Sequence, residues 1–455
     1  MSYATAVEHL SALSGELAPA APGAPRRKFD LDYMRILVAG LGDPQTRFPS
    51  VLIAGTNGKG STASTLASIL SVSGYRTGLY TSPHLLRVNE RIQISNGHAG
   101  SNSLAEIDDD TFARLYFQVD DAANRLVSGG KLPHLPSFFE VITALAFLAF
   151  AEAEVEIAVL EVGLGGRLDA TNIVDPLASV ITDIALDHTE WLGSTIAEIA
   201  REKAGILRPN GVLITLPQHP EANLAIGEIA MANNVTGLNA ADYLPLREVA
   251  DGSYTVAFAG EALTVQTPLP GEHQRRNVAL AVATSYYLSA QQRYSNISRK
   301  IVELGIRQTR WPGRLERTDL PNWGKLLLDV AHNPAGAWTL RSHLSKAFRE
   351  DALPAPRTLV FSALRDKSVE EMAKILFPIF EDPGDRILLA PISSPRAAST
   401  EQLAAVAKSL DTSVTVCESV AEAMRLAASV PGSVVVSGSV YLVGEVKAWL
   451  QGARA

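Results

Sequence analysis

The sequence predicts an α/β protein of two domains, with a mostly parallel sheet in the N-terminal domain and a smaller, doubly wound α/β domain after it. Short apolar runs, typical of buried parallel strands, alternate with segments in which apolar residues have helical spacing. The chain has 455 residues and is 47% hydrophobic, whereas a single core stops growing at roughly 250 to 300 residues. We therefore expect an N-terminal domain over 1–306, a hinge over 307–312 and a C-terminal domain over 313–455.

The N-terminal domain is expected to begin with a loop over 18–25, rich in Ala and Pro, and a helix over 30–41. The strands expected after them are 51–54, 77–80, 157–160, 179–184 and 212–215, and the helices are 62–73, 137–152 and 195–204. Residues 83–100 interrupt this order, and the alternating apolar residues of 243–267 predict a β-hairpin at an antiparallel edge. The alternation predicts a parallel sheet with helices on both faces.

The rest of the chain repeats this alternation. Helices are expected over 272–289 and 296–305, and strands over 326–330, 358–361, 386–390, 413–416 and 433–436, with helices between the strands. This is the pattern of a second doubly wound domain.

Composition excludes several classes of protein. The net charge is −8 and the basic residues are scattered, which argues against a nucleic-acid partner. The single Cys417 excludes an intramolecular disulfide and a thiolate metal cluster, and favours a reducing compartment. The longest apolar run, 141–151, is about half the length of a bilayer-spanning helix, and Glu8 and Glu16 are unlike a signal peptide. We expect a cytoplasmic protein that binds neither nucleic acid nor membrane.

A glycine-rich turn after the apolar run 51–54 is the strongest functional signal, with the sequence Gly55-Thr56-Asn57-Gly58-Lys59-Gly60-Ser61. Its glycines allow backbone N–H groups to surround a phosphate, the following helix adds its positive end, Lys59 adds a charge and Ser61 a hydroxyl for Mg²⁺. The alternative is a strand-to-helix turn without a ligand, which does not need a Lys and a hydroxyl there. The spacing departs from the usual P-loop, because Gly60 separates Lys59 from Ser61.

Polar residues that follow other predicted strands are the next candidates, because ligands of open α/β sheets bind at the carboxyl ends of the strands. Glu161 ends one apolar run and precedes a glycine segment, which makes it a candidate Mg²⁺ ligand. Asp187-His188 and the segment 81–84, which includes Ser82, end two other runs. Each of these residues alone is more often structural, and their convergence at one sheet edge favours a site.

Lys203, in the last turn of a predicted helix, has two interpretations. It can complement the helix dipole, or its neutral amine can take up CO₂ close to a metal and phosphates. The sequence alone favours the first.

Three segments of the second half combine residues that can hold a nucleotide from the far side: 274–277 with Asn277, 311–314 with Arg314, and 329–334 with Asp329 and His332. The same residue types also cap helices or bridge domains without contacting a ligand.

With these motifs together, the chain resembles the folate branch of the Mur ligase superfamily, the dihydrofolate synthase and folylpolyglutamate synthase enzymes. The resemblance spans nearly the whole chain and is carried by 55–61, 81–85, 161–172, 187–189, 202–206, 311–316 and 329–334. Gly60, which breaks the general P-loop rule, is typical of this branch.

The resemblance implies a Mur ligase-like fold with ATP in the cleft between the two domains. It implies catalytic roles for Lys59, His188 and Lys203, the last as a carbamylated lysine, and one or two Mg²⁺ ions held by Ser61, Ser82, Glu161 and His188. The residues implied to bind ATP are Thr56, Asn57, Gly58, Lys59, Gly60, Ser61, Asn277, Arg314, Asp329 and His332. Those implied to line the pterin or folate pocket are Ser137, Phe138, Phe139, Glu140, Leu168, Asp169 and Ala170.

The implied reaction joins L-glutamate to dihydropteroate, and also to tetrahydrofolate, through an acyl phosphate, with release of ADP and phosphate. The resemblance also implies a monomer. The alternatives are a folylpolyglutamate synthase only, a cell-wall-type Mur ligase, a P-loop kinase or ATPase, and a nucleotide-binding module without chemistry. Cell-wall ligases usually carry a further N-terminal substrate domain, and about fifty residues precede the loop here. A kinase would not need the second domain with Asp329 and His332.

Overall fold

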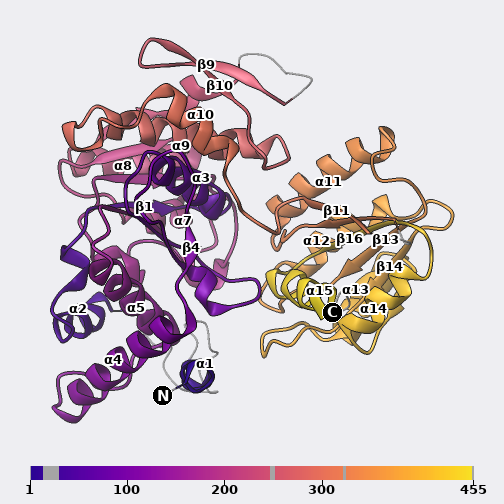
Figure 1. Ribbon diagram of the computed structural model, residues 1–455. Helices are drawn as coiled ribbons and strands as arrows, with labels where there is room; N and C mark the ends of the chain where they lie inside the picture. Colours follow the sequence, from indigo (N-terminus) through magenta and orange to yellow (C-terminus); the bar gives the residue numbers. More distant parts are fainter. Residues whose placement is uncertain (1, 14–29, 246–251, 321–323, 453–455) are drawn as a thin grey trace.

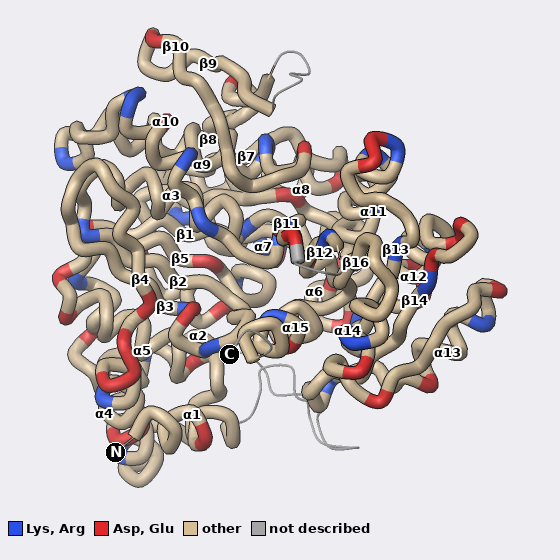
Figure 2. Tube along the Cα trace, turned by 45° about the vertical axis from the view of Figure 1, so that its right-hand side comes forward, with Lys and Arg blue, Asp and Glu red and all other residues tan. Residues whose placement is uncertain are grey.

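The computed structural model describes residues 2–13, 30–245, 252–320 and 324–452, which form two α/β bodies side by side (Figure 1). The predicted loop over 18–25 lies outside these residues. The predicted fold class is confirmed: a large, mostly parallel sheet precedes a smaller one. Acidic and basic residues are interspersed along the chain trace (Figure 2). Among the described helices, none is long and apolar enough to cross a membrane.

The large sheet has eight strands in the order β4-β3-β2-β5-β1-β6-β7-β8. Only β3 and β4 run antiparallel to their neighbours. The strands are β1 (Ser50–Ala54), β2 (Thr77–Tyr80), β3 (Ile92–Ile94), β4 (Ala105–Glu106), β5 (Ile157–Glu161), β6 (Ala178–Ile181), β7 (Val212–Thr215) and β8 (Thr236–Asn239). The five predicted strands are confirmed, while β3, β4 and β8 were not predicted. β6 ends at Ile181, before the expected residue 184, because the carbonyl of Asp183 bonds the glycine-rich loop instead of continuing the sheet.

Helices cover both faces of this sheet, as predicted, and each face has its own core. One core contains Leu52, Leu160 and helices α1 (Tyr3–Ala12), α2 (Leu31–Ala39), α4 (Asp109–Ser128), α5 (Phe138–Glu152), α7 (Ile196–Ala204) and α8 (Pro220–Ala232). The other contains Val51, Val159 and helices α3 (Lys59–Val72), α9 (His273–Ser289) and α10 (Arg299–Arg307). Neighbouring residues of one strand enter opposite cores because side chains alternate across a sheet.

Helix α4 is the longest element that the sequence analysis left unassigned. Asp108 caps its N-terminus, where the side chain accepts from the N–H of Thr111. Phe112, Leu115 and Val119 are buried along one face at helical spacing. The signal was therefore present in the sequence.

Helix α3 starts at Lys59 rather than at the expected residue 62, and it is enclosed on every side. All its residues from Gly60 to Val72 are buried. Several of its hydroxyls have partners inside the protein: Thr65 donates to the carbonyl of Ser61 at 2.8 Å, and Ser68 to that of Gly305 at 2.7 Å. Small residues let the surrounding elements approach the helix that begins at the glycine-rich loop.

The predicted hairpin is present as β9 (Tyr254–Phe258) and β10 (Glu261–Val265). Its predicted position at an antiparallel edge is wrong, because the two strands form a sheet of their own and the large sheet ends at β4 and β8 among the described strands. Residues 246–251 of the predicted segment lie outside the description.

The smaller sheet has six strands in the order β11-β12-β16-β13-β14-β15. Its strands are β11 (Glu316–Leu320), β12 (Gly324–Leu328), β13 (Arg357–Phe361), β14 (Arg386–Leu389), β15 (Thr415–Val416) and β16 (Gly432–Ser437). Its helices are α11 (Pro334–Arg349), α12 (Val369–Leu376), α13 (Thr400–Ser409), α14 (Val420–Ala428) and α15 (Val440–Gly452). The five predicted strands are present with small shifts, and the antiparallel edge strand β11 was not predicted.

The two bodies are joined by one chain segment, and they also contact each other away from it. The chain passes from α10 to β11 through 308–315, so we retain the proposed division at 307–312. Leu85, in the loop after β2, packs against the core of the second body. Its carbonyl lies so close to α15 that a Cβ on Gly444 would be 2.1 Å from the oxygen.

Candidate active site

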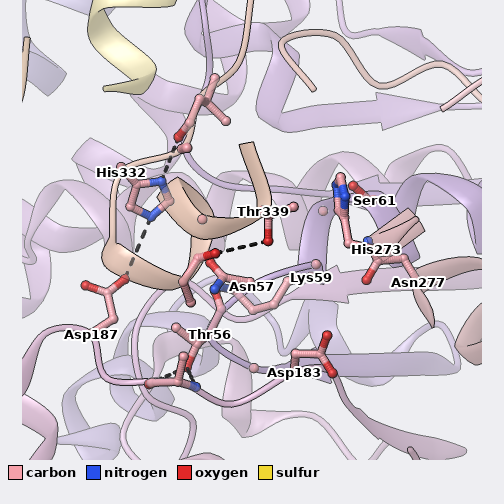
Figure 3. A pocket seen from close by; sticks show the side chains of 18 of the residues that line it. Thr56, Asn57, Lys59, Ser61, Asp183, Asp187, His273, Asn277, His332 and Thr339 are labelled. Atoms are coloured by element: carbon pink, nitrogen blue, oxygen red, sulfur yellow. Dashed lines mark hydrogen bonds and ion pairs between the residues drawn. The ribbon is translucent and has the colours of Figure 1, made fainter. Parts of the chain in front are cut away.

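A cavity of 340 Å³ lies between the two domains and collects most of the predicted site residues. Its walls come from the glycine-rich loop, the ends of β2, β5 and β6, the start of α9, and the segment from the end of β12 into α11. Figure 3 shows Lys59, Ser61, Asn277 and His332 around this space. The expectation that the strand ends converge is therefore met.

The glycine-rich loop is held by a neighbouring strand end. The N–H groups of Thr56 and Asn57 both donate to the carbonyl of Asp183, at 2.9 and 3.1 Å. The Thr56 hydroxyl donates to the carbonyl of Ala185 at 3.0 Å. Because these two N–H groups are occupied, the donors left for an anion are those at the start of α3, at Gly58, Lys59, Gly60 and Ser61, which have no intrahelical partner.

Gly58 needs both its conformation and its lack of a side chain. Its φ of 89° is left-handed, and a Cβ there would lie 2.1 Å from Oδ1 of Asn277. Asn277 in turn donates to Oε1 of Gln274 at 2.9 Å. The Nε2 of Gln274 is buried without a protein partner among the described residues. This donor, on a side chain that lines the cavity, is available to a ligand.

Glu161 ends β5 and lies in the cavity wall with 4% of its surface exposed. It accepts a hydrogen bond from the N–H of Ser82 at 3.1 Å, which joins two of the predicted metal ligands. Burial raises the pKa of this carboxyl, while Lys59 and Arg314 oppose that shift. Ser61 lines the same cavity and is 2% exposed.

Lys203 reaches the phosphate loop from the last turn of α7. Its Nζ donates to the carbonyl of Gly55 at 2.8 Å, and the residue is 4% exposed. Burial lowers its pKa to about 7, and the charge of Lys59 acts in the same direction. A Lys that only complements the helix dipole would keep its ammonium in solvent, so the position of Lys203 favours the functional interpretation.

His188 is held by a residue of the second domain. Its Nε2 lies 2.8 Å from Nζ of Lys367, and the same amine contacts Oδ1 of Asp187 at 2.7 Å. Burial lowers the pKa of His188 to about 3, and Lys367 acts in the same direction. For Asp187, burial alone would raise the pKa, but Lys367 and the two neighbouring imidazoles hold it well below its usual range.

Asn333, which caps α11, is a second polar link across the cavity. Its Nδ2 donates to Oδ1 of Asn57 and to Oδ2 of Asp187, each at 3.0 Å. His332 lies beside it, with Nε2 3.8 Å from Oδ2 of Asp187 (Figure 3). Burial lowers the pKa of His332 to about 4.

Asp329 and Arg314 form the far wall. Asp329 accepts from the N–H groups of Leu315 and Ala331, both at 2.9 Å, so its carboxylate also fixes the segment that carries Arg314. Burial raises the pKa of Asp329 and lowers that of Arg314, and the opposite charges of the two groups oppose both shifts.

The residues expected to line a pterin pocket lie outside the wall of this cavity. Ser137 and Glu140 form the capping box of α5. Phe139 is a core residue, 4% exposed. The guanidinium of Arg91 lies 5.0 Å from the ring centre of Phe138.

Asp169, in the segment 168–170, has a local structural role. Its carboxylate accepts from the N–H groups of Gly163 and Leu164, at 3.0 and 2.9 Å, and from the N–H of Thr171. These contacts shape the glycine segment, part of which lines the cavity.

Comparisons with known proteins agree with this geometry. The model of the Mur ligase middle domain matches residues 122–285, and that of the dihydrofolate synthetase C-terminal domain matches 317–450. The dihydrofolate synthase/folylpolyglutamate synthase of Bacillus subtilis is 33% identical over 428 residues, which cover 92% of this chain and 94% of that protein. The chain belongs to the dihydrofolate synthase/folylpolyglutamate synthase family. The predicted family is thereby confirmed.

Solved structures of this family share the fold. Mycobacterium tuberculosis folylpolyglutamate synthase complexed with ADP and AMPPCP matches with a TM-score of 0.81 and 32% identity, over 92% of this chain and 95% of that one. Escherichia coli FolC in complex with DHPP and ADP matches with a TM-score of 0.80 and 30% identity, over 100% of this chain and 99% of that one.

Sequence analysis missed Gln274, which lines the cavity, and two residues that bond to other residues of the cavity wall, Lys367 and Asn333. Lys367 lies six positions beyond Phe361, the last residue of the buried strand β13, so the rule that singled out Glu161, a polar residue directly at the end of an apolar run, did not select it. Asn333 and Gln274 lie inside segments that were chosen for other residues. The contacts of Asn333 depend on how the two domains meet, whereas Gln274 accepts from Asn277 one turn further along the same helix.

Proposed function

We propose that this protein uses ATP to join L-glutamate to dihydropteroate and to reduced folates, with release of ADP and phosphate. One observation carries the proposal. The donors at the start of α3, the buried Glu161 and the buried Lys203 face Arg314 and Asp329 of the second domain across one cavity. The family to which the chain belongs includes relatives named for both activities.

The wall of the cavity fits a Mg²⁺ ion that is bound together with a nucleotide. Magnesium is usually held by one or two carboxylates and by phosphate oxygens, without a cage made of protein alone. The described residues contain no group of three or more acidic, His or Cys ligands, but Glu161 and Ser61 line the same wall. We propose that these two hold the ion, whose charge would offset that of the phosphates.

His188 can join them only after a change. Its Nε2 contacts Lys367 at 2.8 Å, so it can bind a metal only when this amine moves away. We therefore propose His188 as a ligand of the closed, loaded state. Ser82, whose N–H is bonded to Glu161, remains the candidate for a second ion.

Lys203 is suited to carry CO₂. With a pKa of about 7, a large part of this amine is neutral at neutral pH, and only the neutral form attacks the carbon of CO₂, with loss of a proton. We propose that Lys203 carries a carbamate in the active enzyme. The carbamate is an anion beside Lys59, and it would replace the hydrogen bond that Lys203 donates to Gly55.

The residues of this chain account for the chemistry that the reaction needs. A carboxylate is a poor acyl donor, because its oxygen is a poor leaving group, and transfer of the γ-phosphoryl group of ATP converts it into an acyl phosphate. Lys59 and the N–H groups at the start of α3 would stabilise the charge on the transferred group. The amine of glutamate then attacks the acyl carbon and phosphate leaves. Closure of the second domain over the cavity would exclude water from the activated acyl group.

We propose that the acceptor lies beside the loop 82–91, outside the nucleotide cavity. Arg91 stacks on Phe138 and donates to Nδ1 of His84 at 2.9 Å, so a buried cation and a half-buried ring lie next to the loop that reaches Glu161. Phe138 is therefore the best supported of the predicted pterin contacts. Cytoplasmic location and a monomeric state remain predictions.

An acceptor assay tests the function. The purified protein is incubated with ATP, Mg²⁺ and L-glutamate, together with dihydropteroate in one series and tetrahydrofolate in another. We expect ADP and the glutamylated product in both series. ADP formation that does not require glutamate would favour a kinase or ATPase, and product from tetrahydrofolate alone would favour the monofunctional alternative. Absence of ADP above the acceptor-free background with every pterin acceptor would overturn the proposal.

A further inference from the structure

Trp311, in the segment that joins the domains, lies directly on the first turn of α3. A Cβ on Gly60 would be 2.3 Å from Cζ2 of Trp311 and 2.8 Å from Cε2, closer than real Cβ contacts come. The indole thus covers the backbone between Lys59 and Ser61, the two predicted phosphate and metal contacts.

The contact with Trp311, and not the backbone conformation, accounts for the lack of a side chain at Gly60. Among the described glycines with positive φ are Gly55 and Gly58, but Gly60 is not one of them. It lies within a regular helix, where alanine is favoured over glycine by about 1 kcal/mol. The residue that departs from the usual P-loop spacing is therefore small because of Trp311.

Further contacts bind the hinge to the same helix. Ser64 donates to the carbonyl of Arg310 at 2.8 Å, one residue before Trp311. The guanidinium of Arg314 lies 5.9 Å from the centre of the Trp311 ring and reaches into the cavity wall. One indole thus touches the turn that would bind phosphate in the first domain and the arginine of the second domain.

The indole is held by packing against Gly60 and by the contact with the Arg314 guanidinium. Its Nε1 is buried without a hydrogen-bond partner among the described residues. A change in the angle between the domains, which moves Arg314, would therefore shift the ring against Gly60, because no hydrogen bond fixes the indole.

We propose that Trp311 is a positioning residue that couples the angle between the domains to the phosphate-binding turn of α3. When the ring packs on Gly60, it sets the position of Arg314 relative to the N–H groups of residues 59–61. A nucleotide that binds both then fixes the two domains in one relative orientation. The inference rests on the proposed function, because it takes the ligand of this cavity to be a nucleotide.

Substitutions at the two contact partners test the coupling through ADP binding, measured by calorimetry without turnover. We expect Gly60→Ala to weaken ADP binding at least tenfold, because the methyl group displaces the ring. Trp311→Leu should weaken ADP binding less than Gly60→Ala does. When Gly60→Ala is added to Trp311→Leu, ADP binding should weaken by less than threefold, since leucine leaves room for the methyl group. The matched control is Gly227→Ala in α8, where a Cβ meets no atom within 4 Å, and it should bind ADP as the wild type does.

A distance measurement separates coupling from simple packing. Spin labels at Met231→Cys in α8 and Val416→Cys in β15, in a Cys417→Ala background, report the separation of the domains, and both sites are exposed. With saturating ADP, the wild type should give one narrow distance distribution and Trp311→Ala a broad one, while Trp311→Phe restores the narrow one. This comparison also decides the question if Gly60→Ala does not fold.

Two results would overturn the inference: wild-type ADP affinity in Gly60→Ala, or a narrow distribution in ADP-saturated Trp311→Ala. Its failure is distinguishable from failure of the proposed function. If only the coupling is wrong, the wild type still binds ADP and forms the glutamylated product, whereas a wild type that does neither contradicts the function itself.

Discussion

The two domains present different walls to the same cavity. On the N-terminal side, Lys203 is held by the carbonyl of Gly55 and Glu161 by the N–H of Ser82, both backbone groups of the same domain. On the C-terminal side, Asp329 is likewise held by N–H groups of its own domain, but Lys367 and Asn333 bond to Asp187, a cavity-lining residue of the opposite domain.

This difference indicates that the two walls have different tasks. A wall held by its own backbone is already arranged for a ligand and needs little reorganisation when one binds. A wall whose side chains bond the other domain must exchange these bonds when a ligand enters. We infer that the first wall sets the rate of the chemical step and that the second sets the arrangement of the domains. The following predictions test this division.

The largest effect is expected at Lys59. Lys59→Ala removes the charge that would stabilise the transferring phosphoryl group, and we expect kcat to fall by about 10³-fold. Initial rates of ADP release measure it, with Lys131→Ala as a control because Lys131 is an exposed lysine of the same domain. A variant with a near-normal rate would remove Lys59 from the proposed phosphate role.

The next effect is expected at Lys367, on the opposite wall. Loss of one partner of a buried ion pair costs about 3 kcal/mol or more, so Lys367→Met should loosen the contact between the domains. The pKa of His188, now about 3, should rise toward its ordinary value of 6.5, because the nearby positive charge is gone while Asp187 remains. Titration of the imidazole signals by NMR checks this.

The control for Lys367 is Lys374→Met, which breaks an exposed pair with Glu370 in the same domain. It should leave the titration of His188 unchanged. An unchanged His188 in Lys367→Met as well would show that Lys367 does not form this link in solution.

A smaller effect concerns pH and the buried Lys203. The pKa of this amine is about 7 in the folded protein and 10.5 as its ordinary value, so between these values the unfolded chain binds more protons. Stability from this group therefore rises with pH in that range, by about 1.4 kcal/mol per pH unit at most, and is lowest below pH 7. Lys203→Met should lack this component.

Denaturant unfolding of wild type and Lys203→Met between pH 7 and 10, in buffers free of CO₂, measures the difference in slope. The pH dependence that arises from all other ionisable groups is common to both proteins and cancels in the difference. Equal slopes would mean that the amine is not buried as described.

The smallest effect is expected at Arg276, whose guanidinium forms a bidentate pair with Asp183. Both side chains are about one-third exposed, at 32% and 35%, so the pair should contribute no more than about 1 kcal/mol. Because the loop is held by the backbone carbonyl of Asp183, Arg276→Met should change the KM for ATP less than threefold. A larger change would show that side chains, not backbone, hold this wall.

The N-terminal wall could be predicted from sequence because local patterns specify it. The loop 55–61 and Glu161 follow apolar strands, and parallel strands bring their carboxyl ends to one edge. The structure adds hydrogen bonds that the spacing of the sequence motifs does not predict. The carbonyl of Asp183 uses two of the loop's N–H groups, so the donors that remain lie at the start of α3.

The C-terminal wall could be predicted only in part. Asp329 and His332 follow a recognisable strand, whereas the contacts of Lys367 with Asp187 and His188 join residues about 180 positions apart. The contact of Trp311 with Gly60 is of the same kind. Such pairs depend on how two separately folded bodies meet, which neither periodicity nor local motifs specify.

Because α3 is buried along nearly its whole length, hydrogen exchange of its backbone amides can report ligand binding. From Thr62 to Val72 its residues are buried and lie beyond the cavity-lining first turn, so their amide hydrogens should exchange with solvent only when the whole domain unfolds. A ligand that binds only the folded state slows that exchange by a factor of 1 + [L]/Kd. Deuterium uptake along α3 would therefore rank nucleotides, glutamate and pterins by affinity, in a measurement that requires no turnover.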